Sequence, residues 1–303
     1  MKRRWAVVVL AVLAVSAPAR GAESKGSRKE LRVFISADME GVAGVVNAAQ
    51  LSPGEFEYER FRHLMTAEVN AAVEGALASG ATKITVADSH GNGLSILPDE
   101  LNPKVRLIRS WPRPLEMMEG VEGGFDAAFF VGYHASINTP NAVRAHTISS
   151  KRFYDVRLNG QHASEAYLNA AVAGQFGVPV VLVTGDLHIV TEAKKTIDSN
   201  ITGVAVKRSI GYHSADSVSP EMARALIKEG ARNALSRLAS VKPFVVTKPL
   251  RLEIAFKSMI NAEILAFLPG VERVDGSTIA FTAKDPAEMM RFISFVAQYD
   301  SNQ

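Results

Sequence analysis

The sequence predicts a layered α/β/α fold around a mostly parallel or mixed sheet, followed by a smaller C-terminal α/β unit. Strand-length apolar segments alternate with longer segments of helical period, and 47% of the 303 residues are hydrophobic, enough for one large domain or two modest ones. Two Lys-Pro pairs, at 242–243 and 248–249, indicate a seam before the smaller unit. We assign residues 31–213 to the larger domain and 214–303 to the smaller one.

The first residues have the pattern of a signal peptide. Three positive charges at 2–4 precede the apolar run Trp5–Val15, and Ala17-Pro18-Ala19 supplies small residues for cleavage after Ala19. A run of about eleven residues is too short to span a hydrocarbon core of roughly 30 Å, so a signal peptide over 1–19 is favoured over a membrane anchor. Residues 20–30 form a polar, flexible lead-in. We therefore expect an exported protein, periplasmic or secreted, without a stable membrane span after cleavage.

The next segment predicts three buried strands and one helix. Strands are expected at 31–37, 83–87 and 127–131, each a short apolar-rich segment closed by polar residues and glycine. Between the first two, apolar side chains at 61, 64, 69, 73 and 76 follow one face of a helix within 54–79, and Gly80 fits its end.

The same alternation continues to the C-terminus. Segment 152–158 followed by Asn159-Gly160 predicts a hairpin, because Asn-Gly favours the tight turn that matches strand twist. Helices are expected at 164–175, 191–197, 219–238, 262–268 and 286–299. Strands are expected at 178–184, 203–207, 251–256 and 277–282.

Composition excludes several classes of function. Removal of residues 1–19 takes away three positive charges, so the formal net charge falls from +3 to zero. No cluster of Lys and Arg interleaved with aromatic residues follows, and nucleic-acid binding is not expected. The chain has no cysteine, so disulfides, thiolate ligands and a lipid-anchored N-terminus are excluded. Any metal site must be built from His, Asp and Glu.

Three consecutive strands end in residues that can bind a metal ion. Asp38 and Glu40 follow the first strand, His90 the second and His134 the third. Ligands of α/β sheets gather beyond the carboxyl ends of the strands, so these side chains can converge. Each ending alone has an ordinary explanation as a helix cap or a hydrogen-bonded core histidine. Three on successive strands favour a metal site.

The residue types suit two divalent ions. Imidazole nitrogens and carboxylate oxygens are the available ligands, and two ions roughly 3.5–4 Å apart need a bridging carboxylate. Asp38 is short and follows a rigid strand, which favours it as the bridge, and Glu40 is expected on the same side of an extended chain. Glu165 begins a helix after the hairpin; it could face the ions or only stabilise the helix N-terminus. His and carboxylate ligands suit zinc, manganese or cobalt.

These motifs together resemble the M55 peptidase family of zinc-dependent D-aminopeptidases, the DppA type. The likeness runs from about Arg32 to Phe295 and keeps the order of the motifs with ordinary loop lengths between them. It rests on Ile35-Ser-Ala-Asp38-Met-Glu40-Gly41-Val-Ala-Gly44, Asp88-Ser-His90, Gly132-Tyr-His134-Ala, Thr139-Pro140, Ala145-His146-Thr147 and Ser164-Glu165.

The resemblance implies two divalent metal ions, with zinc expected, and a large ring-like homo-oligomer. It also implies a ligand set and a catalytic histidine: metal ligands at Asp38, Glu40, His90, His134 and Glu165, and catalysis by His146. Asp186 and His188 are left outside the site, because Leu187 stands where the family often has a second acidic residue. Lys207 fits the family pattern, but its role is open.

The expected reaction is removal of N-terminal D-amino acids from short peptides by metal-activated water. His146 could be the nucleophile or could move protons; the proton role is favoured, because water activated by metals is already a good nucleophile. D-alanyl peptides from cell-wall turnover are a substrate hypothesis. Two alternatives stay open: another di-metal amidase or phosphoesterase, or a non-catalytic periplasmic binding protein. A serine hydrolase is disfavoured because the sequence has no G-x-S-x-G motif, and a common zinc protease is disfavoured because it has no H-E-x-x-H motif.

Overall fold

We describe the fold from a computed structural model of the chain, which describes residues 30–299. The expected signal peptide over 1–19 and all but the last residue of the lead-in over 20–30 lie outside the described residues. No helix within 30–299 is both long and apolar enough to cross a membrane.

A seven-stranded sheet with the order β3-β2-β1-β4-β7-β8-β9 forms the centre of the larger unit. All of its neighbouring strands are parallel except β8 and β9, which are antiparallel. The strands are β1 (Leu31–Ala37), β2 (Ala81–Asp88), β3 (Val105–Ile108), β4 (Ala127–Tyr133), β7 (Val180–Asp186), β8 (Thr202–Gly211) and β9 (Ser214–Ser217). The strand order reverses between β1 and β4: the strands β2 and β3 follow on one side of this pair, and β7 and β8 follow on the other. Ligands of such sheets bind at the carboxyl ends of the strands next to this switch point.

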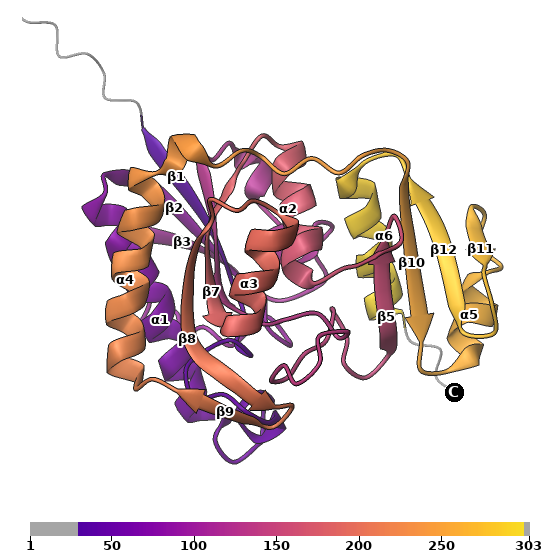
Figure 1. Ribbon diagram of the computed structural model, residues 1–303, viewed down its shortest axis with the longest axis horizontal. Coiled ribbons are helices and arrows are strands. Elements are labelled where there is room, and N and C mark those ends of the chain that lie inside the picture. Colours follow the sequence, from indigo (N-terminus) through magenta and orange to yellow (C-terminus); the bar gives the residue numbers. More distant parts are fainter. Residues whose placement is uncertain (1–29, 300–303) are drawn as a thin grey trace, which may run out of the picture.

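Helices cover both faces of this sheet (Figure 1). On one face, α1 (Tyr58–Ala78) packs against α4 (Pro220–Ser236); on the other lie α2 (Glu165–Gln175) and α3 (Leu187–Thr196). The central strands are covered on both sides, and every residue of β4 (AAFFVGY) is buried. Fully covered parallel strands read as apolar runs in sequence, which is why the pattern of residues 127–131 predicted this strand. The expected α/β/α layering is confirmed.

A second, five-stranded antiparallel sheet has the order β11-β12-β10-β5-β6. It combines β5 (Phe153–Leu158) and β6 (Gln161–His162) with β10 (Leu250–Phe256), β11 (Val271–Arg273) and β12 (Thr278–Ala283). Helix α6 (Pro286–Gln298) lies between this sheet and α2, and the short α5 (Met259–Leu265) packs on β10 and β12 (Figure 1). Short 3-10 turns occur at η1 (Ala48–Gln50), η2 (Glu116–Met118), η3 (Val121–Gly123) and η4 (Leu238–Ser240).

The division between the two sheets differs from the expected boundary between residues 213 and 214. Strand β9 and helix α4 belong to the larger unit, because β9 pairs with β8 and α4 packs on α1. Strand β5, from the middle of the chain, pairs with β10 in the smaller sheet. The second sheet is therefore discontinuous in sequence, and the Lys-Pro pairs lie near the actual crossing into it.

Most expected elements are present with shifts of a few residues. The hairpin at Asn159-Gly160 forms as expected, with φ of +52° and +79° at the two turn residues. Helix α3 begins four residues before the expected start at 191, because Asp186 caps it. The strands β3, β9 and β11 were not predicted; each is short and lies at a sheet edge, where β3 reads VRLI, β9 reads SADS and β11 reads VER. A polar edge strand has no apolar run or alternation to mark it.

Candidate metal centre

The carboxyl ends of β1, β2 and β4 bring the predicted strand-end residues together. Asp38 follows β1, His90 lies two residues beyond β2, and His134 follows β4 directly. All three side chains are buried. Glu40 reaches the same place from a turn rather than from an extended chain, so the expected period of two is wrong there although the side chain arrives as expected.

One cluster consists of Asp38, Glu40 and His90. The His90 Nδ1 lies 2.8 Å from Glu40 Oε2 and 3.2 Å from Asp38 Oδ1. On its other side, His90 Nε2 donates to the carbonyl of Leu51 at 2.7 Å. A carbonyl only accepts, so in the neutral ring Nδ1 carries no proton and turns its lone pair toward the two carboxylates.

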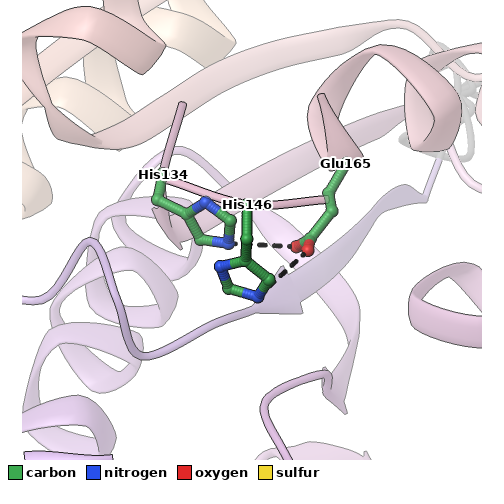
Figure 2. A group of neighbouring side chains, drawn as sticks. All are labelled: His134, His146 and Glu165. Carbon is green, nitrogen blue, oxygen red and sulfur yellow. Dashed lines mark ion pairs between the residues drawn. The ribbon is translucent and has the colours of Figure 1, made fainter. Parts of the chain in front are cut away.

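The second cluster consists of His134, His146 and Glu165 (Figure 2). Glu165 Oε2 lies 3.4 Å from His134 Nε2, and Glu165 Oε1 lies 3.6 Å from His146 Nε2. The two imidazole rings stack, with centroids 4.2 Å apart. Ser164 caps α2 through the amide of Tyr167, which places Glu165 in the first turn of the helix and aims it at this cluster.

Hydrogen bonds to backbone carbonyls also show which ring nitrogen carries the proton in neutral His134 and His146. His134 Nδ1 donates to the Ala135 carbonyl at 3.0 Å, and His146 Nδ1 donates to the Arg144 carbonyl at 2.9 Å. Both Nε2 atoms are therefore bare in the neutral rings and face Glu165. A second hydrogen bond that orients a ring in this way is usual for histidine ligands of metals.

Two buried atoms at the junction of the clusters have no hydrogen-bond partner within residues 30–299, namely Asp38 Oδ2 and His134 Nε2. They lie 3.4 Å apart, and both are acceptors in the neutral-histidine state. Buried acceptors without donors are costly, and facing acceptors repel. A divalent cation would resolve both problems, so the donor set fits a metal centre that Asp38 and His134 would help to hold.

The charges of the centre also call for cations. Burial and the nearby Glu40 carboxylate raise the pKa of Asp38 to about 7. Burial opposes ionisation of Glu40 as well, but the His90 charge holds the pKa of that carboxyl well below its ordinary value. The pKa of His90 is raised well above its ordinary value, against the effect of burial, by Glu40 and Asp38. Without metal, a proton on His90 supplies the positive charge that metal ions would supply to these carboxylates.

The loop that carries Asp38 and Glu40 lies in close contact with the end of β4. The Gly41 amide donates to the Gly132 carbonyl at 2.7 Å. A Cβ on Gly41 would lie 2.1 Å from the Tyr133 carbonyl oxygen, and one on Gly132, at φ +73°, would lie 2.2 Å from the Asp38 carbonyl oxygen. Only glycine permits this approach at both positions.

Lys207 binds the backbone of the same loop. Its buried ammonium donates to the carbonyls of Glu40, Val42 and Val45 at 2.5, 2.9 and 2.8 Å, which uses all three of its protons. Burial lowers its pKa to about 8, while the nearby Asp186 carboxylate opposes that shift. Lys207 is therefore a positioning residue for the loop, a role that the sequence pattern left open.

Glu68 and Asp186 complete this support. Glu68, on α1, accepts the Ala43 amide at 2.9 Å. Asp186 accepts the amides of His188 and Ile189 and so caps α3, while its Oδ2 lies buried without a hydrogen-bond partner in the described chain. His188 lines a different cavity. Neither Asp186 nor His188 belongs to the two clusters.

A cavity of about 370 Å³ opens over the clusters. Its volume is within the range of small-ligand sites. The charged and imidazole side chains that line it are Asp38, Glu40, His90, Glu116, Arg144, His146, Lys151 and Glu165. His134 lies beneath it, 1% exposed.

Carboxylates and imidazoles gathered in a cavity at the switch point of a parallel sheet are typical of metal-dependent hydrolases. The family model for M55 peptidases, described as D-aminopeptidase, matches residues 31–295, so the chain belongs to the M55 family of D-aminopeptidases. A D-aminopeptidase of Bacillus subtilis (strain 168) is 35% identical over 260 residues, covering 85% of this chain and 93% of the relative. A solved structure, described as the Zn-dependent D-aminopeptidase DppA from Bacillus subtilis, a self-compartmentalizing protease, matches with a TM-score of 0.84 and 33% identity, covering 89% of this chain and 99% of that one.

Proposed function

We propose that the protein is a di-metal aminopeptidase that removes N-terminal D-amino acids from short peptides. Metal ligands would be Asp38, Glu40, His90, His134 and Glu165. The observation that carries the proposal is the placement of Asp38 between two histidines, each with a bare nitrogen turned toward it. Membership of the D-aminopeptidase family supports peptide hydrolysis over a phosphoesterase or a binding protein. The Zn-dependence in the description of the related structure supports zinc.

Two divalent ions held there would polarise the scissile carbonyl and lower the pKa of a bound water toward about 7. The protein's own proton carrier is His146. Burial lowers the pKa of His146, and in the metal-free protein the positive charge of His134 lowers it further. Its Nε2 carries no proton in the neutral ring, so this atom is available to accept one. The hydrogen bond from Nδ1 to the Arg144 carbonyl holds the ring in place while Nε2 accepts a proton and returns it to the leaving amine.

Activity on matched D- and L-alanyl peptides, with zinc and after chelation, tests this function. We expect hydrolysis of the D-peptide only, its loss on chelation and its return on adding zinc. Equal rates of hydrolysis of the D- and L-alanyl peptides would refute the D-specific proposal. Hydrolysis of phosphoesters in place of peptides would refute the proposed peptidase activity.

Export and assembly are further parts of the proposal. The pattern of residues 1–19 supports cleavage after Ala19 and a periplasmic or secreted site, where D-alanyl peptides from cell-wall turnover would be substrates. The self-compartmentalizing relative supports a homo-oligomer. Exposed apolar side chains such as Phe56, Phe267 and Val245 are consistent with subunit contacts. N-terminal sequencing of the exported protein and light scattering test these points.

A further inference from the structure

One acidic side chain in the cavity belongs to neither metal cluster. Glu116 begins the short turn η2 and lines the same cavity as Asp38, His146 and Glu165. It is 4% exposed. The other three carboxylates in the described lining of this cavity, those of Asp38, Glu40 and Glu165, are all proposed metal ligands. Glu116 is therefore the negative group left for a substrate.

The Glu116 carboxylate is incompletely paired. Its Oε1 is buried and has no hydrogen-bond partner among residues 30–299. A glutamate this deeply buried is almost always paired. The nearby Arg113 forms no ion pair with it in the described chain. Its Nη2 donates to the Asp88 carbonyl at 2.7 Å and its guanidinium lies over the Trp111 ring at 3.6 Å, while its Nε and Nη1 have no hydrogen-bond partner among residues 30–299. The unpaired oxygen points to a missing donor.

The backbone at this position is also unusual. Glu116 has φ of +50°, in the left-handed region that non-glycine residues rarely adopt. Arg144 and Ile148, at +53° and +63°, line the same cavity. Such strained residues gather at binding and catalytic sites, where the surrounding structure holds them. The fold therefore holds Glu116 in the cavity at a cost in local strain.

We propose that Glu116 binds the protonated α-amine of the substrate peptide. An aminopeptidase must separate a free amino terminus from an acylated or internal residue, and a positive amine is recognised by a buried anion. Metal ions neutralise the other carboxylates of the cavity, whereas Glu116 keeps an unpaired oxygen. Burial and the Glu165 carboxylate raise the pKa of Glu116, partly opposed by the Ser294 hydroxyl and Arg113, and a cationic amine would favour its ionised form. This inference rests on the proposed aminopeptidase function.

The test compares wild type, Glu116→Gln and Glu122→Gln, all loaded with zinc. Glu122 is exposed and six residues further along, so it is a matched control for the loss of one carboxylate. We would measure KM and kcat on D-alanyl p-nitroanilide, and inhibition by D-alaninol and by its neutral counterpart (R)-propane-1,2-diol. Neither inhibitor has a scissile bond, so inhibition reports binding alone.

We expect Glu116→Gln to raise KM for the anilide and the inhibition constant of D-alaninol by roughly 30-fold or more, because a buried charge pair loses one partner. Inhibition by the diol should not change, and kcat should change less than KM. Glu122→Gln should match wild type. If Glu116→Gln fails to fold, Glu116→Asp keeps the charge and should bind D-alaninol more weakly than wild type but more tightly than the diol.

Unchanged D-alaninol inhibition in a folded variant would overturn the proposal and assign amine binding to the metal ions. An equal loss of affinity for both inhibitors would also overturn it, because it would show a general change of cavity shape. These outcomes are separate from failure of the function itself: a wild-type protein that hydrolyses no D-aminoacyl substrate refutes the aminopeptidase assignment, whatever the variants do.

Discussion

The two carboxylate oxygens of Asp38 face two different histidines: Oδ1 lies 3.2 Å from His90 Nδ1, and Oδ2 lies 3.4 Å from His134 Nε2. Each histidine belongs to a separate cluster with its own glutamate, Glu40 in one and Glu165 in the other. One short side chain at the end of β1 thus connects both halves of the centre.

This arrangement predicts different metal contents for three variants. His90→Ala and His134→Ala should each retain about one of two zinc ions, because each removes a ligand from one cluster. Asp38→Asn should retain neither tightly, because it weakens both sites. Elemental analysis after gel filtration measures the contents. Two ions per chain in Asp38→Asn would contradict a shared carboxylate.

His146 should affect catalysis more than metal content. We expect His146→Ala to keep both zinc ions and to lose roughly 100-fold or more in kcat, as for removal of a proton-transfer group. Because burial lowers its pKa below the ordinary 6.5, the loss of His146 as a base should appear only below pH 6.5, at lower pH than the fall in activity expected near about pH 7 from a metal-bound water. Loss of one ion in His146→Ala would instead make it a metal ligand.

Lys207 should matter far more than a surface lysine. Lys207→Met removes the cation that binds three backbone carbonyls and lies near the Glu68 and Asp186 carboxylates. We therefore expect the unfolding free energy to fall by about 3–5 kcal/mol and zinc binding to weaken. The control is Lys228→Met, at a half-exposed pair with Glu74, where about 1 kcal/mol or less is expected. Denaturant unfolding and zinc titration measure both effects; equal losses would rule out the positioning role.

Gly41 tests the close approach of the ligand loop to β4. Gly41→Ala places a Cβ 2.1 Å from the Tyr133 carbonyl, so the loop must move and both stability and zinc affinity should fall. Gly211→Ala is the matched control, because nothing lies within 4 Å of a Cβ there. Thermal melting and zinc titration compare them. A Gly41→Ala protein with wild-type zinc affinity would show that the loop position is not critical.

Glu68 predicts a pH-dependent stability difference. Burial raises its pKa from 4.5 to about 7, so its ionisation opposes folding; stability present below pH 4.5 is lost as pH rises to about 7. Between pH 4.5 and 8, the unfolding free energy of metal-free Glu68→Gln should rise relative to that of the metal-free wild type by on the order of 3 kcal/mol. Glu74→Gln, at a half-exposed site, should show little pH-dependent difference. Denaturant unfolding at a series of pH values measures the difference. Unfolding free energies of wild type and Glu68→Gln that change in parallel with pH would disprove this prediction.

The sequence alone was enough to predict the layered α/β fold and the convergence of Asp38, Glu40, His90 and His134. Both depend on local patterns: buried parallel strands read as apolar runs, and the polar residues that follow them must lie at one edge of the sheet. The family resemblance added Glu165 and His146, which the structure places beside His134.

The tertiary structure decided what depends on contacts between distant segments. Strand β5 pairs with β10 about one hundred residues later, so no local pattern could assign it to the second sheet. Lys207 lies more than 160 residues from the loop that it binds. Glu116 looks in sequence like any surface glutamate, and only the packing around η2 shows that it is buried, has one oxygen without a partner in the described chain and lines the same cavity as the proposed metal ligands.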